Sequence, residues 1–506
     1  MTPEREETAV VPQEVPGPVA AAVALAVSAF GAAVAPKLAG AEGEPEDQMR
    51  GPLEVFIGAV ADELGVTITS VGETSLSDLR VRPDYAMKVN GAVTGYIEVK
   101  APGKGADPTR WKKNSHDAQQ WEKLRALPNV LYTDGQEWGL YRTGERVGEV
   151  VRLVGDVRTS GRALTTADDG LAMLLTSFVH WEPVAPRQIR QLVRSVAPLT
   201  RLLRDEVVDT LAREKKAGGG PFSSLADDWR ALLFPEAGDA EFADGYAQSV
   251  AFALLLARTE SIDFAGKSVD AIAKELGKTH SLLGKALSIL TDETIGALAV
   301  TLDTLVRVIS VVDFARFAKH IADPYLALYE LFLEEYDPEL RKKTGSYYTP
   351  AAVVASMTRL TDQVLRTRLD RPQGFADESV TIVDPAMGTG TYVLDVLETV
   401  AGTVAASEGP GAVPARLRET AKRLVGIEIQ TGPYAVAELR VAEALHRYKA
   451  GIPADGLRLY VADTLDDPFA EQAHLAATMA PIAASRKNAN KMKAEEPVVV
   501  VIGNPP

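Results

Sequence analysis

A glycine-rich turn follows a short apolar run in the last third of the chain. Residues 381–383 (TIV) lead directly into the octapeptide DPAMGTGT, which begins at Asp384. Its two glycines, Gly388 and Gly390, let the backbone turn tightly and approach a ligand at distances where a Cβ would clash. The turn is typical of nucleotide sites, although plain tight turns share the pattern.

Acidic residues end the next two apolar runs. Residues 424–428 (LVGIE) end in Glu428, and residues 459–463 (LYVAD) end in Asp463. In Rossmann-like sheets an acid at the end of the second strand commonly binds ribose hydroxyls, and Asp463 is suited to an adenine amine. Each acid taken singly is also compatible with a plain surface carboxylate. The succession of the turn and the two acids indicates a nucleoside-containing ligand.

A final apolar run, residues 498–502 (VVVVI), precedes Asn504-Pro505-Pro506. Its β-branched residues predict a buried strand. The tripeptide would then lie at the C-terminal end of that strand, where open α/β sheets bind their ligands. Helical patterns alternate with strand patterns from residue 336 onward, which predicts a partial Rossmann-like sheet.

This succession resembles the S-adenosylmethionine-dependent DNA methyltransferases of the amino class. The resemblance covers residues 325–506 and follows the γ permutation, in which target recognition comes after the Asn-Pro-Pro segment. One upstream segment is similar to the family's element that closes over the methionine moiety of the cofactor. The cofactor-binding residues that the resemblance implies are Tyr348 and Thr349 in that segment, with Asp384, Gly388, Gly390, Glu428 and Asp463.

In that family the residues at Asn504, Pro505 and Pro506 form the catalytic segment. The Asn504 amide oxygen and the Pro505 carbonyl accept the N–H groups of an exocyclic amine, which localises its lone pair for in-line attack on the sulfonium methyl. The target base first leaves the duplex. Asn in the first position favours adenine N6 over cytosine N4. The family's aromatic residue is not reached, so we expect a methyltransferase domain that is incomplete at its C-terminus.

A second constellation lies near the N-terminus. Asp84 and Glu98 flank the hairpin signal Asn90-Gly91, and Lys100 lies on the same face of the predicted strand as Glu98. The pattern resembles the Pro-Asp…Glu-x-Lys nucleases, whose two acids hold Mg²⁺ and whose lysine stabilises charge or orients a water molecule. Alternating charge on an exposed strand produces the same Glu-x-Lys spacing.

A nuclease, a helical spacer and a γ-type methyltransferase together resemble the single-chain restriction-modification enzymes of Type IIG. Glu46 or Asp47 would be a further acid for the nuclease, although solvent exposure is the simpler interpretation. Type ISP enzymes are similar but place a helicase-like ATPase between the two parts. Residues 277–279 (GKT) match a fragment of a phosphate loop, but Ile272 stands where its first glycine belongs, so we interpret them as a helix end.

We therefore predict a multidomain α/β protein. Its parts are a loose N-terminus (1–19), an α/β restriction-nuclease-like domain (20–150), a helical connector (151–335) and the incomplete methyltransferase domain (336–506). The strands expected in the nuclease-like domain are residues 66–70, 85–89, 95–99, 130–133 and 138–141.

The composition argues against a general coat of basic residues. The 506-residue chain has a formal net charge of −15 and no cysteine, which fits a reducing, cytoplasmic compartment. Basic stretches at residues 100–113 and 486–493 are compatible with a local DNA groove or with solvated loops. Residues 18–36 are uncharged but rich in alanine, which favours a packed helix over a membrane span.

These patterns predict a restriction-modification protein that transfers a methyl group from S-adenosylmethionine to adenine N6 in double-stranded DNA, with an Mg²⁺-dependent endonuclease domain and no membrane partner. Two alternatives stay open. Protein glutamine methyltransferases also use an Asn-Pro-Pro segment. The chain could instead be an inactive fragment, or a subunit that needs a separately encoded C-terminal half carrying target recognition.

Overall fold

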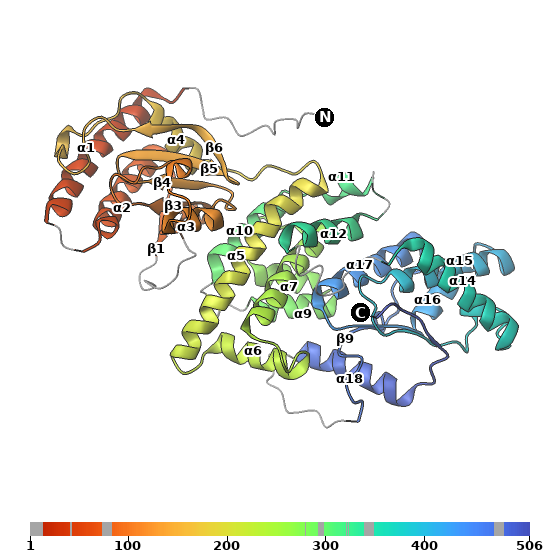
Figure 1. The fold of residues 1–506 in the computed structure, drawn as a ribbon. Helices are drawn as coiled ribbons and strands as arrows, with labels where there is room; N and C mark the ends of the chain where they lie inside the picture. Colours follow the sequence, from red (N-terminus) through yellow and green to blue (C-terminus); the bar gives the residue numbers. More distant parts are fainter. Residues whose placement is uncertain are drawn as a thin grey trace. The chain divides into compact units, whose positions relative to one another are not determined.

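The computed structural model describes residues 14–40, 43–72, 83–278, 280–291, 298–319, 321, 323–337, 349–469 and 480–505. The chain divides into two compact units (Figure 1). The first consists of Met1–Val184 with Val300–Val308, and the second of Ala185–Ala299 with Ile309–Pro506. Each unit therefore combines segments that are separated in the sequence.

The first unit contains a six-stranded sheet whose strands lie in sequence order. The strands are β1 (Ile68–Gly72), β2 (Tyr85–Val89), β3 (Ala92–Val99), β4 (Val130–Thr133), β5 (Glu137–Arg142) and β6 (Glu145–Arg152). Only β3 and β4 are parallel neighbours, and α3 (His116–Leu124) lies in the crossover that such a pair requires. The predicted Asn90-Gly91 turn is confirmed, with positive φ values of 51° and 85° typical of a type I′ hairpin.

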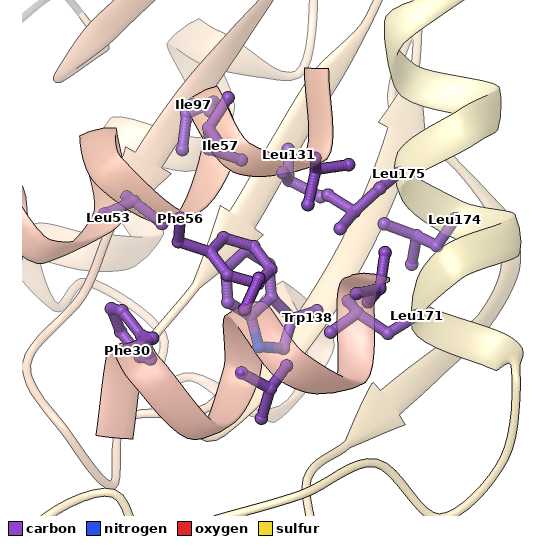
Figure 2. Close-up of a cluster of buried hydrophobic side chains, with 14 of the residues drawn as sticks. Phe30, Leu53, Phe56, Ile57, Ile97, Leu131, Trp138, Leu171, Leu174 and Leu175 are labelled. Carbon is purple, nitrogen blue, oxygen red and sulfur yellow. The ribbon is translucent and has the colours of Figure 1, made fainter. Parts of the chain in front are cut away.

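Three helices contribute to the core of this unit: α1 (Gly17–Gly40), α2 (Pro45–Glu63) and α4 (Gly170–Val179). Figure 2 shows Phe30, Phe56 and Trp138 among buried aliphatic side chains. The ring centroids of Phe56 and Trp138 lie 5.2 Å apart, a spacing at which aromatic pairs are stabilising. By length and composition alone α1 could cross a membrane. In the structure one face of α1, which includes Val27 and Phe30, is buried in this core.

The second unit contains a parallel sheet in the order β10-β7-β8-β9. Its strands are β7 (Ile382–Asp384), β8 (Leu424–Glu428), β9 (Leu459–Val461) and β10 (Val500–Val501). Because β8 and β10 lie on opposite sides of β7, the order of the strands reverses at β7. Such a reversal places the ligand crevice at the C-terminal ends of the strands.

Helices surround this sheet and precede it in the chain. Those before the sheet are α5 (Ile189–Lys216), α6 (Pro221–Leu232), α7 (Asp239–Thr259), α8 (Val269–Leu276), α9 (Ser281–Leu290), α11 (Phe314–Ala318), α12 (Pro324–Tyr336) and α14 (Ala351–Arg368). Those between the strands are α15 (Thr391–Ser407), α16 (Val413–Ala421), α17 (Thr431–Arg447) and α18 (Ala480–Glu495). Most of α10 (Ala299–Ser310) belongs to the first unit. Short 3₁₀ turns are η1 (Pro108–Arg110), η2 (Gly161–Ala163) and η4 (Gly374–Ala376).

The segment predicted as a connector, residues 151–335, is shared between the two units. Its helix α7 packs against α12 and α17 of the second unit. The ring centroids of Phe252 in α7 and Phe332 in α12 lie 4.8 Å apart, and the Ser249 hydroxyl hydrogen-bonds that of Thr431 at the start of α17. Helix α4, by contrast, supplies apolar side chains to the first core. The predicted boundaries at residues 150 and 335 therefore do not coincide with the compact units.

Three local features differ from expectation. Helix α1 begins at Gly17, inside the segment 1–19 that the composition predicts to be loose. Strand β6 has no predicted counterpart, because Val147 is its only buried side chain and gives no apolar run. The prediction of a buried strand at residues 498–502 is confirmed only in part: β10 covers two residues, and although Val500 and Ile502 are buried, Val501 is 68% exposed at the edge of the described sheet.

A buried histidine joins three helical segments of the second unit. His280 is 2% exposed, and its ring nitrogens lie 3.6 Å from a carboxylate oxygen of Glu260 and 3.4 Å from one of Glu438. Burial lowers the pKa of His280, but the two carboxylates outweigh it and raise the pKa from 6.5 to about 9. Since the folded-state pKa lies above the unfolded value, this pairing stabilises the fold fully below about pH 6.5 and is lost as the pH rises through about 9.

We expect His280→Gln to lower the free energy of unfolding by on the order of 2 kcal/mol at about pH 6 and by much less above about pH 9. Urea unfolding at both pH values measures the difference. The exposed His180, changed to Gln, is the control. An equal loss at both pH values would mean that His280 stabilises the fold by packing rather than by its charge.

Candidate functional site

The glycine-rich turn lies at the switch point of the parallel sheet. It follows β7, and Gly388 and Gly390 adopt positive φ values of 55° and 80°, a conformation that favours glycine. The N–H of Met387 donates to the Ile427 carbonyl (3.0 Å), and the N–H of Gly388 donates to the Glu428 carboxylate (2.9 Å). The turn is thus anchored to the end of β8.

Asp384 ends β7 and is 1% exposed. One carboxylate oxygen accepts a hydrogen bond from the Ala386 N–H (3.2 Å), and the other has no hydrogen-bond partner among the described residues. Burial raises the pKa of Asp384 to about 7. A Cβ added to Gly388, in the same turn, would meet no atom within 4 Å. An orphaned buried oxygen next to an open stretch of backbone fits a polar ligand at this turn.

The two acids after the neighbouring strands contact backbone groups in this structure. The Glu428 carboxylate accepts from the N–H groups of Gly388 and Gln430, at 2.9 and 2.8 Å. Asp463 lies in the loop after β9, and its carboxylate accepts from the Leu465 N–H (2.8 Å). Both carboxylates stand at the predicted edge of the sheet, where each retains lone pairs for a further donor.

Helix α18 holds the loop that follows β9. The Lys493 ammonium donates to the carbonyls of Asp463 (3.3 Å) and Asp466 (2.7 Å), and Arg486 forms an ion pair with the Asp466 carboxylate. The basic stretch 486–493 therefore lies on a helix, and two of its cations bind the protein itself. The stretch is therefore not a solvated loop, and Arg486 and Lys493 bind the loop after β9 instead of lining a free basic groove.

Asn504 lies next to the glycine turn because β10 runs parallel to β7. A Cβ added to Gly503 would lie 2.5 Å from an Asp384 carboxylate oxygen, so only glycine fits at this position. The Asn504 amide nitrogen donates to the Thr349 hydroxyl (3.3 Å). The structure thus brings together three predicted site residues that are far apart in the sequence. Of the other predicted residues, Pro505 is exposed, and Tyr348 and Pro506 lie outside the described residues.

A cavity of about 600 Å³ adjoins this turn. Its lining includes Asp323, Thr391 and Arg440, but neither Glu428 nor Asp463. The cavity lies in the second unit beside the start of α15. The two acids predicted to bind the nucleoside therefore do not line this cavity.

Comparison with known proteins agrees with this geometry. Residues 322–506 match the family model described as N-6 DNA Methylase. Over these residues the chain is similar to the N-6 DNA methylase family. No curated protein matches the chain.

Solved structures resemble the chain over various lengths. The cryo-EM structure of a DrdV–DNA complex is 21% identical with a TM-score of 0.42, and the match covers 95% of this chain and 43% of that chain. The ATP-dependent Type ISP restriction-modification enzyme LlaBIII bound to DNA is 17% identical with a TM-score of 0.47, over 67% of this chain and 22% of that one. A nuclease-deletion mutant of the Type ISP enzyme LlaGI is 17% identical with a TM-score of 0.45, over 66% and 25%. The chain spans less than half the length of each.

Apart from the methylase domain, the first unit brings the second predicted constellation together. Asp84 precedes β2, and its carboxylate accepts from the Val99 N–H in β3 (2.7 Å). The Asp84 N–H donates to one Glu98 carboxylate oxygen (3.3 Å), and the Lys100 ammonium lies 2.8 Å from the other. Lys100 also contacts Gln120 of α3. Asp84 and Lys100 therefore both contact Glu98, and Gln120 of α3 contacts Lys100.

This cluster is buried. Glu98 is 2% and Lys100 3% exposed. Burial and the neighbouring Asp84 carboxylate raise the pKa of Glu98 to about 8, and burial raises the pKa of Asp84. Carboxylates whose pKa is raised by burial next to a specific charged partner are typical of functional sites, although structural ion-pair networks also produce them.

The carboxylates have the donor type that Mg²⁺ prefers, but each also contacts a protein cation. Asp84 pairs with Arg50 of α2, and Glu98 pairs with Lys100. Glu46, four residues before Arg50, accepts a hydrogen bond from the Ala101 N–H (2.8 Å). Among the described residues no group of three or more His, Cys, Asp or Glu is placed to hold a metal ion. Arg50 was not predicted, because its partner lies 34 positions away; only its helical spacing from Glu46 gives a signal.

Proposed function

We propose that the chain acts in a DNA restriction-modification enzyme. Its methylase domain would transfer a methyl group from S-adenosylmethionine to adenine N6 in double-stranded DNA, and its first unit would be an Mg²⁺-dependent endonuclease. The observation that carries the methylase proposal is the position of Asn504 beside the Asp384 turn. At this switch point a substrate amine and a cofactor can meet.

The orientation of Asn504 supports transfer to an amine. Its amide nitrogen donates to Thr349, which leaves the amide oxygen to accept an N–H of a flipped-out adenine. The Pro505 carbonyl would accept the second N–H. Two such bonds localise the nitrogen lone pair and align it, which is a positioning and electrostatic effect. Extrusion of the base costs a few kcal/mol.

The residues around the turn fit the cofactor. S-adenosylmethionine supplies an electrophilic methyl group when bound. Glu428 would bind its ribose hydroxyls, Asp463 its adenine amine, and the orphaned Asp384 oxygen a polar group near the turn. Gly388 leaves the space that the ligand needs. Tyr348, with Thr349, would close over the methionine moiety.

In the first unit, Asp84 and Glu98 would hold Mg²⁺ through their carboxylate oxygens. The ion would polarise a DNA phosphate when bound. Lys100, buried against Glu98, would orient the attacking water or stabilise charge on the phosphate. Glu46 of α2 would be a further acid for this site, because its pKa is raised mainly by burial and also by the nearby Asp84 carboxylate.

Two exposed features favour a partner segment. Among the described strands β10 pairs only with β7, and α14 exposes an apolar stripe. The stripe consists of Val353, Met357, Leu360 and Val364. Open edges and apolar stripes of this kind mark interaction surfaces. We infer that a C-terminal half carrying target recognition covers them. Separately, the cysteine-free composition leads us to propose a cytoplasmic protein. Intact mass from native cells distinguishes a separately encoded half, with a mass near 54.1 kDa, from a continuous chain.

Tritiated S-adenosylmethionine and unmodified double-stranded DNA test the methylase proposal. We expect label on adenine N6. Label in protein glutamine would favour the glutamine methyltransferase alternative instead. The nuclease proposal predicts cleavage of unmethylated DNA with Mg²⁺ and none with EDTA. If neither product forms when the C-terminal half is supplied, the inactive-fragment alternative holds.

A further inference from the structure

Arg440 lies outside all the predicted cofactor residues, yet it contacts the glycine turn of the methylase domain. Its side chain, on α17, is 6% exposed. One guanidinium nitrogen donates to the Thr389 carbonyl and, at 3.2 Å, to the Thr389 hydroxyl. The other two nitrogens lie 2.8 and 2.7 Å from one carboxylate oxygen of Asp323. All three nitrogens therefore have partners, and they join the turn to Asp323.

Asp323 is itself fixed at the start of α12. Its other carboxylate oxygen accepts a hydrogen bond from the Leu326 N–H (2.9 Å), so the same side chain caps the helix and pairs with Arg440. The contacts run from α12 through α17 to Thr389. No other arginine of the second unit is seen, among the described residues, to bridge an acid and this turn.

The turn needs such a contact because its two glycines are conformationally permissive. Gly388 and Gly390, both with positive φ, flank Thr389, and glycine loses more conformational freedom on ordering than any other residue. A turn that is ordered before its ligand arrives binds more tightly, since less entropy is lost on binding.

We propose that Arg440, held by Asp323, is a positioning residue that keeps the Gly388–Gly390 turn in its cofactor-binding conformation. This inference rests on the proposed function, because it takes S-adenosylmethionine as the ligand of the turn. In this role Arg440 acts through the Thr389 carbonyl rather than by contact with the cofactor.

Two substitutions separate this role from general stability. Arg440→Lys keeps the charge, but one ammonium group cannot reproduce the fork that reaches both Asp323 and the turn. Asp323→Asn keeps an acceptor for the Leu326 N–H and so preserves the helix cap, while it removes the ion pair.

Arg423→Lys is the matched control. Arg423 also donates to main-chain carbonyls, those of Phe375 (3.1 Å) and Val380 (2.6 Å). These lie before β7, at the end of the strand opposite the turn. The control therefore removes the same kind of contact from the same sheet without touching residues 388–390.

Calorimetric titration of the whole chain with S-adenosylmethionine gives the first readout. We expect the dissociation constant to rise about tenfold in Arg440→Lys and Asp323→Asn, and by no more than about twofold in Arg423→Lys. The double variant should bind no more weakly than Arg440→Lys alone, because both changes break one chain of contacts. Without cofactor, amide hydrogen exchange in a peptide spanning the turn should rise at least about threefold in the first two variants only.

Parental affinity in Arg440→Lys, or an equal loss in Arg423→Lys, would overturn the positioning role. If Arg440→Lys does not fold, Asp323→Asn carries the same test. If the parent chain does not bind S-adenosylmethionine, the proposed function fails, and the exchange measurement alone then decides whether Arg440 orders the turn.

Discussion

Glu98→Gln is expected to reduce Mg²⁺-dependent cleavage of unmethylated DNA by at least about a hundredfold. Glu98 is the centre of the first-unit cluster, since it accepts from the Lys100 ammonium at 2.8 Å and from the Asp84 N–H at 3.3 Å. Glutamine has nearly the same size but carries no charge, so it is a poor ligand for a divalent cation and removes the ion pair between Glu98 and Lys100. The rate of plasmid cleavage at saturating Mg²⁺ measures the effect.

Glu137→Gln is the control for this experiment. Glu137 lies on β5 of the same sheet, is 7% exposed and forms an ion pair with Arg152 (2.8 Å), but does not contact Asp84 or Glu98. We expect it to cut DNA at close to the parental rate. Retained cleavage in Glu98→Gln would reject the nuclease assignment, whereas equal losses in both variants would show that the sheet had been destabilised.

Asn504→Ala is expected to slow methyl transfer to DNA by about a hundredfold to a thousandfold, the usual effect of removing one well-placed polar group from a reaction site. The affinity for S-adenosylmethionine should stay within about threefold of the parent, because the amide oxygen is assigned to the substrate amine. Single-turnover transfer from tritiated cofactor, with the C-terminal half supplied, gives the rate. Equilibrium binding gives the affinity.

Asn488→Ala and Asn504→Asp complete the comparison. Asn488 is exposed on α18, so its loss should change neither quantity. Asn504→Asp keeps an acceptor oxygen and should retain more activity than Asn504→Ala. A parallel loss of rate and cofactor affinity in Asn504→Ala would mean that Asn504 holds the turn, through Thr349, rather than the base.

Much of the local structure could be predicted because its signals are local. The strands at 85–89, 130–133 and 424–428 have the expected bounds, since each combines an apolar pattern with a turn close by in the chain. The Asn90-Gly91 hairpin likewise depends on two adjacent residues that tolerate positive φ. The predicted site residues of the second unit could be placed near one another from the order of their strands alone, because the C-terminal ends of parallel strands share one edge of the sheet.

The domain boundaries could not be predicted in the same way. Helices α4 and α7 have similar apolar patterns, yet α4 joins the core of the first unit and α7 packs against α12 in the second. An apolar face specifies that a helix is buried, but not against which sheet. The extent of the short strand β10 could not be predicted for a related reason, since a run of valines does not indicate that the strand pairs on one side only among the described strands.

The sequence by itself determined which residues we propose for the chemistry, because the Asp-Pro-x-x-Gly-x-Gly turn, the strand-ending acids and the Glu-x-Lys pair are defined by type and short spacing. Only the tertiary structure decided what holds them. Arg50 pairs with a residue 34 positions away, Arg440 with one 51 positions away, and Lys493 with a loop 27 positions away. A long cationic side chain can pair with any acid or carbonyl within reach, and which one comes within reach is set by the packing of apolar faces that bring distant segments together.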